Sequence, residues 1–95
     1  MFFVYLLQHT VTQELYVGYT NNIKRRIKEH NQRGKKFTTQ LEGEWTLIYC
    51  EVYRMQADAV DREQKLKHHG SGKRELYKRV KNSLLPKTGA GKRSG

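Results

Sequence analysis

Residues 15–30 read LYVGYTNNIKRRIKEH, and this stretch decides the fold that we expect. It opens with a short β-prone run, which Gly18 interrupts. Asn22 is of the type that caps helix N-termini, and the apolar residues after it recur at helical spacing, so we expect an amphipathic helix from about Asn22 to Gln32. A strand, a turn and a helix therefore form the unit against which the other segments fold.

One face of the predicted helix carries Ile23, Ile27 and His30, which are spaced by four and three positions. Arg26 lies at the edge of the same face. The spacing predicts that a permanent cation and an imidazole point toward the interior, although the pattern taken alone is also that of a basic surface helix packed on a sheet. The remaining basic side chains of the helix, expected to face solvent, are Lys24, Arg25 and Lys28.

The N-terminal segment supplies a second strand. Residues 2–8 form a largely apolar run, which favours a strand covered on both faces. If this strand pairs with the one at 15–19 around a turn centred on 10–11, Tyr5 lies opposite Tyr16 and both hydroxyls share one face of the sheet. A one-residue bulge would instead place Tyr16 on the other face.

The rest of the chain predicts one more strand and two more helices. Residues 45–53 follow a loop at 33–44 and are rich in aromatic and β-branched side chains, the composition of a strand. A helical pattern follows at 56–68, with Gly70 as its expected C-cap. A further helix is expected to start at Ser71 as N-cap and to be completed by residues 75–85, and Pro86 ends it.

These segments form one domain of residues 1–86, with room for one modest core. We expect an α+β fold in which helices flank a three-stranded antiparallel sheet, in the order β-β-α-β-α-α. Residues 87–95 consist mainly of Gly, Lys, Arg and Ser, so a disordered basic tail is expected there.

Glu63 falls on the apolar face of the 56–68 helix, together with Ala59 and Leu66. A carboxylate in such a place needs a cation, a metal ion or hydrogen bonds. The residues leave two explanations open: a salt bridge to Lys67 or an arginine, or a metal site. Of the nine acidic residues only Glu63 is expected to face inward. A site that holds two metal ions needs several converging carboxylates, so a one-metal site fits better.

The composition points to a polyanionic partner. The chain has 19 Lys and Arg against 9 Asp and Glu, a net charge of +10 on 95 residues. Nucleic acid is favoured over a membrane, because no basic helix carries the bulky aromatic face of an interfacial anchor. The N-terminal apolar run is too short for a signal peptide or a membrane span, and the single cysteine, Cys50, excludes an internal disulfide. We therefore expect a cytoplasmic protein.

The positions of Tyr5, of Tyr16-Val17-Gly18 and of Arg26, eight residues after that glycine, resemble the GIY-YIG nuclease superfamily. The chain is similar to the small stand-alone members and to the N-terminal domain of the excision-repair nuclease. It departs from the family in its first tripeptide, where Phe3 replaces a glycine, and at Glu75, where several members have an asparagine. The segment around Glu63 looks like the family's metal-binding helix.

The resemblance implies a metal-dependent DNA endonuclease with one Mg²⁺ or Mn²⁺ ion per site. Tyr5 or Tyr16 would activate the attacking water, Arg26 would hold the scissile phosphate, and Glu63 would hold the metal ion. His30 would hydrogen-bond a tyrosine or the phosphate. The sequence leaves open which tyrosine is the base. Either phenol, with an ordinary pKa of about 10, would need nearby cations to act as a base at neutral pH.

The expected substrate is duplex or branched DNA, and the similarity to the excision-repair nuclease links the chain to DNA repair or recombination. A non-catalytic nucleic-acid-binding module of the same fold is the main alternative. An RNA-associated protein is the third, but no residues at recognised spacing support it. The residues expected to contact the nucleic-acid backbone are Lys24, Arg25, Lys35, Lys36, Thr39 and Lys73.

Overall fold

The computed structural model describes residues 1–36 and 43–86, with side chains for 1–32 and 43–86. Within these residues it contains a three-stranded antiparallel sheet and three helices, in the predicted chain order. The elements are β1 (Phe2–His9), β2 (Leu15–Thr20), α1 (Ile23–Lys36), β3 (Trp45–Tyr53), α2 (Gln56–His68) and α3 (Gly70–Arg79). The α+β fold is thus confirmed.

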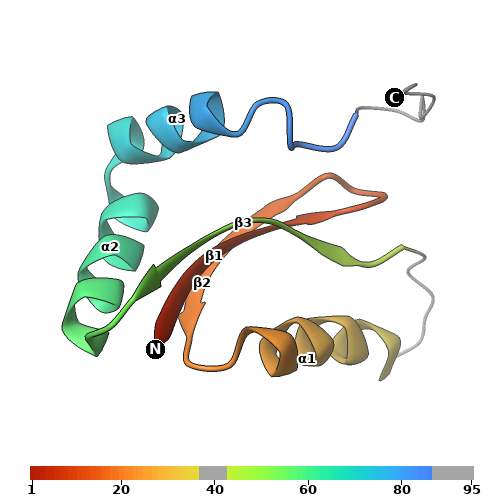
Figure 1. Ribbon diagram of the computed structural model, residues 1–95. Coiled ribbons are helices and arrows are strands. Elements are labelled where there is room, and N and C mark those ends of the chain that lie inside the picture. The colour runs from red at the N-terminus through yellow and green to blue at the C-terminus, as the bar shows by residue number, and fades with distance from the viewer. Residues whose placement is uncertain (37–42, 87–95) are drawn as a thin grey trace.

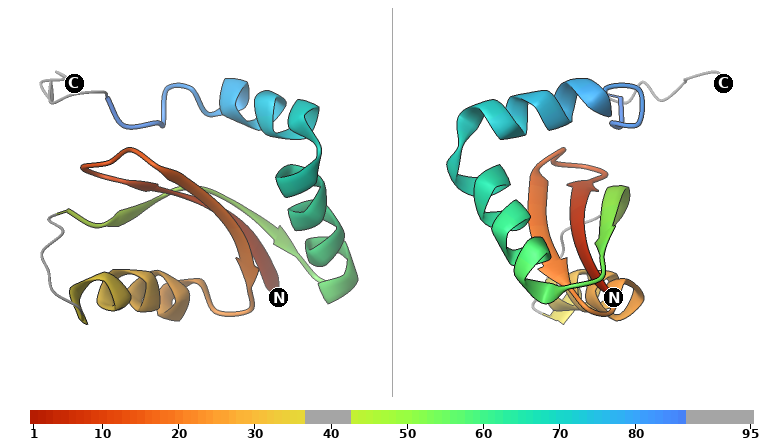
Figure 2. Two further views of the ribbon diagram at one scale, coloured as in Figure 1. Left: turned by 180° about the vertical axis from the view of Figure 1, so that it is seen from behind. Right: turned by 60° about the vertical axis from the view of Figure 1, so that its left-hand side comes forward.

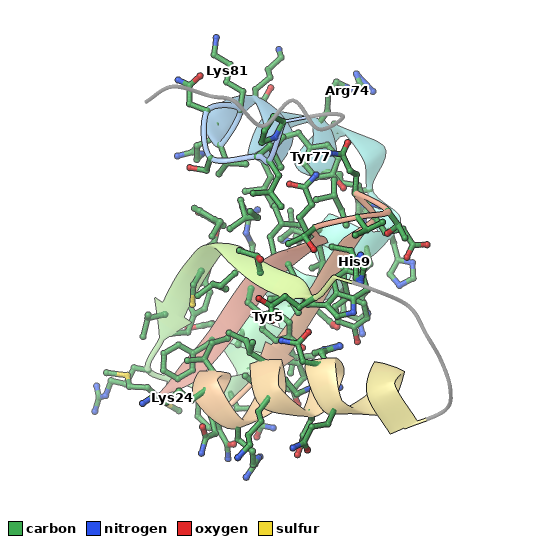
Figure 3. The ribbon with its side chains drawn as sticks, turned by 90° about the vertical axis from the view of Figure 1, so that its right-hand side faces the viewer. Tyr5, His9, Lys24, Arg74, Tyr77 and Lys81 are labelled. Carbon is green, nitrogen blue, oxygen red and sulfur yellow. The ribbon has the colours of Figure 1, made fainter. Side chains whose placement is uncertain are left out.

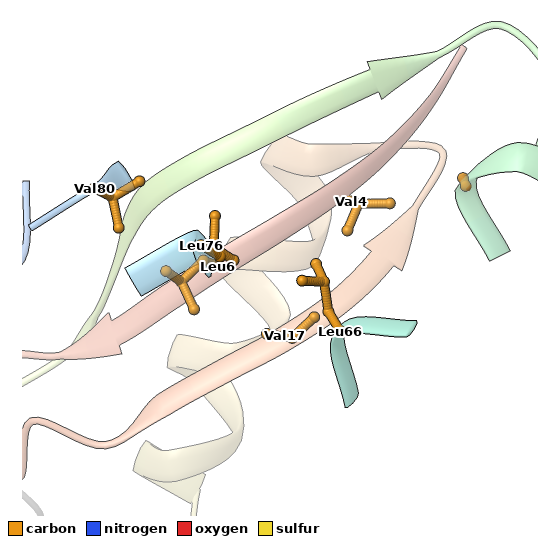
Figure 4. Packing of buried hydrophobic residues seen from close by; sticks show 7 residues of the cluster. Val4, Leu6, Val17, Leu66, Leu76 and Val80 are labelled. Atoms are coloured by element: carbon orange, nitrogen blue, oxygen red, sulfur yellow. The ribbon is translucent and has the colours of Figure 1, made fainter. Parts of the chain in front are cut away.

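Helices lie on both sides of the sheet (Figure 1). α1 runs along one face, and α2 and α3 cover the other (Figure 2). Because side chains alternate along a strand, β1 turns Val4 and Leu6 toward α2 and α3, and Tyr5 toward α1. The core between the sheet and the two last helices (Figure 4) consists of Val4, Leu6, Val17, Ala59, Leu66, Leu76 and Val80.

β1 is the central strand, with β2 and β3 antiparallel on either side. Tyr5 pairs with Gly18, and Tyr16 pairs with Leu7, so the predicted pairing of the two tyrosines is wrong by two residues. A slip of two residues leaves every side chain on its predicted face. The tyrosine rings therefore still share one face, with centroids 6.2 Å apart.

The turn between β1 and β2 explains this register. Nδ1 of the buried His9 accepts the backbone N–H groups of Val11 and Thr12, each at 3.2 Å. Gln13 has a positive φ of 65°, and its N–H donates to the His9 carbonyl at 3.0 Å. The imidazole thus organises the turn and moves its centre one residue beyond the predicted position.

The bounds of β3 and α2 are as predicted, but α1 is longer. α1 begins after Asn22, whose Oδ1 accepts the N–H of Arg25 at 3.0 Å. It continues to Lys36 instead of ending near Gln32. It passes through Gly34, because one glycine inside a helix costs only about 1 kcal/mol.

The last helix also differs from its prediction. α3 begins at Gly70, close to the cap predicted at Ser71, but it ends at Arg79, whereas the predicted helix continues to Leu85. A single extended residue, His69, with φ −118° and ψ 108°, ends α2 and begins α3. The chain therefore turns sharply onto the sheet without a loop.

The segment after α3 returns to the β1–β2 hairpin. Gln8 is buried, its Oε1 accepts the N–H of Leu85 at 2.7 Å, and its Nε2 donates to the Gln13 carbonyl at 3.4 Å. The Gln13 side chain in turn donates to the Pro86 carbonyl. Hydrogen bonds thus connect the end of the described chain to its first strand.

Some expectations fall outside the described residues: the part of the predicted loop at 37–42 and the tail at 87–95. In the part of the chain that the structure does describe, no helix has both the length and the hydropathy needed to cross a membrane.

Candidate active site

Tyr5 lies at the centre of the candidate site, on the face of the sheet that α1 covers (Figure 3). Its side chain is buried, with 1% exposed. Nε of Arg26 donates to the Tyr5 hydroxyl at 3.3 Å, and Nε2 of His30 lies 3.3 Å from the same oxygen. Arg26 and His30 are one turn apart on α1, so both reach one hydroxyl.

Tyr16 forms the second half of the site. It is half-buried, and its ring makes an edge contact with His30, with centroids 4.6 Å apart. Trp45 lies beside both, with its ring centroid 6.3 Å from that of Tyr16 and 6.1 Å from that of His30. These aromatic rings form a wall next to the buried Tyr5 hydroxyl.

Gly18 makes the close approach of the two tyrosines possible. A Cβ atom added to Gly18 would lie 2.5 Å from the Tyr5 hydroxyl oxygen and 3.0 Å from Cε1 of Tyr16. Gly18 was predicted to interrupt the strand, but it lies inside β2. A glycine within a strand pattern marks a place where another group approaches the backbone closely, and this was the signal available in the sequence.

Glu63 approaches the site from α2. Its side chain is 15% exposed, and one carboxylate oxygen lies 3.1 Å from Nζ of Lys67. Nζ of Lys67 also lies 5.6 Å from the centroid of the Tyr16 ring. The salt bridge that the sequence left open is therefore present, and it lies against the aromatic wall of the site.

The electrostatic environment keeps the Tyr5 phenol protonated. Burial raises the pKa of Tyr5, and the nearby Tyr16 and Glu63 raise it further, while the hydrogen bond and charge of Arg26 lower it by less. The hydrogen bond to Tyr5 and the contact with Glu29 raise the pKa of Arg26 above its ordinary value. Arg26 is thus a fixed cation beside a neutral hydroxyl, and its charge does not make Tyr5 a base at neutral pH.

The donor set fits a divalent metal ion that keeps most of its bound waters. Among the described residues there is no group of three or more His, Cys, Asp or Glu side chains arranged to hold a metal ion. Mg²⁺ is commonly bound through one or two carboxylates, with waters and substrate phosphate oxygens completing its shell. Glu63 offers one such carboxylate beside the tyrosines, so a single ion is compatible with the residues present.

The prediction that only Glu63 among the acids faces inward is wrong. The Glu51 side chain is also 15% exposed. It accepts hydrogen bonds from the hydroxyls of Tyr49 and Tyr53, each at 2.6 Å, and from Nε and Nη2 of Arg62 at 2.8 and 2.9 Å. Alternating positions 49, 51 and 53 on one strand face were the sequence signal for this cluster.

Burial of the Glu51 carboxylate costs free energy, which its hydrogen-bonding partners compensate. Burial alone would raise the pKa of the Glu51 carboxyl, but the hydrogen bonds from Arg62, Tyr49 and Tyr53 outweigh it and leave the pKa below its ordinary value. Arg62 precedes Glu63 directly in α2. The cluster therefore fixes the rotation of the helix that carries Glu63.

The predicted nucleic-acid contacts whose side chains the structure describes lie on two sides of the sheet. Lys24 and Arg25 are exposed on the outer side of α1, and Arg25 lies 3.6 Å from Glu29. Lys73 is half-buried on α3, on the other side of the sheet. The side chains of Lys35 and Lys36, and all of Thr39, lie outside the described part of the chain.

Comparison with known proteins gives consistent results. A family model described as "GIY-YIG catalytic domain" matches residues 1–78. A UPF0213 protein of Clostridium perfringens is 38% identical over 68 residues, which is 70% of this chain and 71% of that protein. One of Bacillus velezensis is 32% identical over 79 residues, which is 78% of this chain and 79% of that protein.

A solved structure has the same fold. The solution NMR structure of a UPF0213 protein from Bacillus halodurans is 30% identical to this chain, with a TM-score of 0.51. The match covers 85% of this chain and 86% of that one. Family model, relatives and solved structure thus agree over most of the described residues.

Proposed function

Because this chain belongs to the GIY-YIG catalytic domain family, whose members are generally endonucleases, we propose that it is a metal-dependent DNA endonuclease. The observation that carries the proposal is the meeting of Arg26 and His30 at the buried Tyr5 hydroxyl. The inward carboxylate of Glu63 is joined to this site through Lys67, which contacts both Glu63 and the Tyr16 ring. These groups match the needs of phosphodiester hydrolysis: charge stabilisation at phosphorus, a positioned water and help for the leaving oxygen.

Arg26 is the group that would hold the scissile phosphate. One of its nitrogens is fixed by Tyr5, whereas Nη1 lies 3.0 Å from the exposed Glu29 carboxylate. An exposed ion pair contributes little free energy, so a phosphate can replace Glu29 without a large cost. The guanidinium, held in direction by Tyr5, then offsets the negative charge that grows on the phosphate in the transition state.

The two tyrosines have different surroundings, and this supports different roles. The Tyr5 hydroxyl is already engaged by Arg26 and His30 and is closed to solvent, so Tyr5 positions those two side chains. Tyr16 is half-buried and more open, so the water-activating role falls to Tyr16. Glu63 would hold one Mg²⁺ or Mn²⁺ ion, which when bound stabilises negative charge on the leaving 3′ oxygen.

The wider assignments rest on composition and resemblance. The net charge of +10 supports a nucleic-acid substrate, and the resemblance to the excision-repair nuclease supports a role in DNA repair or recombination. The single cysteine supports a cytoplasmic location.

The test is cleavage of labelled duplex, nicked, flapped and branched DNA with Mg²⁺ or Mn²⁺. Arg26→Ala is expected to lower the rate by about 10²-fold or more, the usual effect of losing a transition-state donor. Arg54→Ala removes an exposed arginine at the end of β3 and serves as the matched control. Equal rates for wild type and Arg26→Ala would contradict the proposal, and DNA binding without cleavage by wild type would favour the non-catalytic module.

A further inference from the structure

Helix α2 carries two lysine–carboxylate pairs at the same spacing but in different surroundings. Lys65 and Asp61 are 3.2 Å apart, and their side chains are 60% and 65% exposed. Lys67 and Glu63 are 3.1 Å apart, but their side chains are 40% and 15% exposed. The first pair is an ordinary surface pair, whereas the second has a mostly buried carboxylate whose charge acts on Tyr5.

The Lys67 ammonium has a second contact, which Lys65 does not share among the described residues. It lies 5.6 Å from the centroid of the Tyr16 ring, within the range in which a cation is attracted to an aromatic face. Lys67 thus stands between the proposed metal carboxylate and the proposed water-activating tyrosine. An i,i+4 pair that only stabilised a helix would need no such position.

We propose that Lys67 is the resident counter-ion of Glu63 and that it couples metal binding to nucleic-acid binding. This inference rests on the function proposed above. A divalent ion at the Glu63 carboxylate repels the ammonium of Lys67, which lies 3.1 Å from one of the carboxylate oxygens, and so favours its displacement. The displaced ammonium, on a flexible four-carbon stem, is then free to contact a phosphate oxygen next to Tyr16.

Metal binding and nucleic-acid binding are coupled because Glu63 and Lys67 are each other's partners when neither ligand is bound. A carboxylate that is mostly removed from water is costly to leave unpaired, so Lys67 competes with the metal ion for Glu63. A phosphate that attracts Lys67 removes this competitor, and a metal ion that occupies Glu63 frees Lys67 for the phosphate. By linkage, each ligand must then raise the affinity for the other by the same factor.

The first experiment measures Mn²⁺ binding without nucleic acid, by electron paramagnetic resonance of the free ion. Lys67→Met keeps the length of the stem and removes the charge. It is expected to tighten Mn²⁺ binding by about threefold to tenfold, because the ion no longer has to open a partly buried pair. Lys65→Met, the matched control, removes the same charge from the exposed pair and is expected to change the affinity by less than about twofold.

The second experiment measures the affinity for a fluorescent duplex by anisotropy, with and without Ca²⁺ at constant ionic strength. Ca²⁺ is expected to strengthen binding to wild type and to Lys65→Met by the same factor. The gain should be smaller in Lys67→Met, since part of the coupling passes through that ammonium. Circular dichroism of each variant checks that it is folded.

The outcomes separate this inference from the proposed function. Equal Mn²⁺ affinities for Lys67→Met and Lys65→Met, with equal Ca²⁺ gains, would reduce the pair to a helix-stabilising contact and overturn the inference. Glu63→Gln should abolish the specific Mn²⁺ binding of wild type. If it left that binding intact, the assignment of Glu63 as the metal ligand, and with it the proposed mechanism, would fail.

Discussion

At the scale of single residues, position 18 has no room for a side chain, because the Tyr5 hydroxyl packs directly against Gly18. Gly18→Ala is expected to lower the free energy of unfolding by about 1–3 kcal/mol, as overpacking does, and to lower any nuclease activity, because the new methyl group would displace the Tyr5 hydroxyl from Arg26. Thermal unfolding and cleavage assays measure the two effects. Gly70→Ala is the control, since its added Cβ has no described atom within 4 Å apart from its chain neighbours and the backbone of its own helix.

If both glycine variants were equally stable, the contact between Tyr5 and β2 would not be the constraint that the structure indicates.

Single residues also show which parts of the candidate site could be predicted from the sequence. The meeting of Arg26 and His30 was predictable because helix geometry alone puts residues four apart on one face. The buried Glu51 was missed because the partners that compensate it, Tyr49, Tyr53 and Arg62, come together only in the folded chain.

At the scale of elements, the Glu51–Arg62 pair holds α2 to β3. Glu51→Gln is expected to destabilise the fold by about 1–3 kcal/mol at pH 7, because Arg62 loses its bidentate charged partner. The pKa of Glu51 is lowered in the folded state, so its contribution is complete above the ordinary carboxyl pKa of about 4.3 and is lost as the pH falls through the folded-state pKa.

Urea unfolding of both proteins at pH 7 and in mild acid measures this effect. The difference between wild type and Glu51→Gln should shrink as the pH falls below about 4. Asp61→Asn, which alters the exposed pair with Lys65, should change stability by less than about 0.5 kcal/mol at either pH. A difference that stayed constant with pH would show that the charge of Glu51 is not what stabilises this contact.

Element boundaries were predictable only where composition changes sharply. β3 and α2 are bounded by such changes, and their predicted limits hold. The end of α1 was not predictable from Gly34, since a helix tolerates a glycine when its packing compensates the cost. The end of α3 was predicted too late, because the helical spacing of the apolar residues continues past Arg79. The strand register depended on a hydrogen-bonded turn around His9, which no apolar pattern reveals.

At the scale of the whole molecule, positive charge lies on both sides of the sheet. Arg74 and Lys81 lie on the far side of the sheet from Lys24 (Figure 3). A straight duplex bound at the α1 side would leave the α3 side free, whereas a branched DNA could reach both. Replacement of Arg74 and Lys81 by Gln should therefore weaken binding to branched DNA more than binding to a linear duplex.

Anisotropy titrations at several salt concentrations measure this difference. For each phosphate that the variant no longer neutralises, the slope of log K against log salt should become less negative by about 0.9 on duplex DNA. The Arg54→Gln, Lys65→Gln double variant controls for a general decrease in charge. Equal effects on branched and linear DNA would assign the α3 side to non-specific attraction only.

The position of β1 has a consequence for how the protein is made. β1 is synthesised before the other described elements but lies in the middle of the sheet, and the hydrogen bonds of its Gln8 are complete only when Leu85 is in place. A ribosome thus releases Tyr5, Arg26 and His30 well before Glu63. Because nascent chains begin to organise from the N-terminus, we expect the contacts of Tyr5 with Arg26 and His30 to form before Glu63 joins the candidate site. If the proposed function holds, an unfinished chain would bind nucleic acid before it could cleave it.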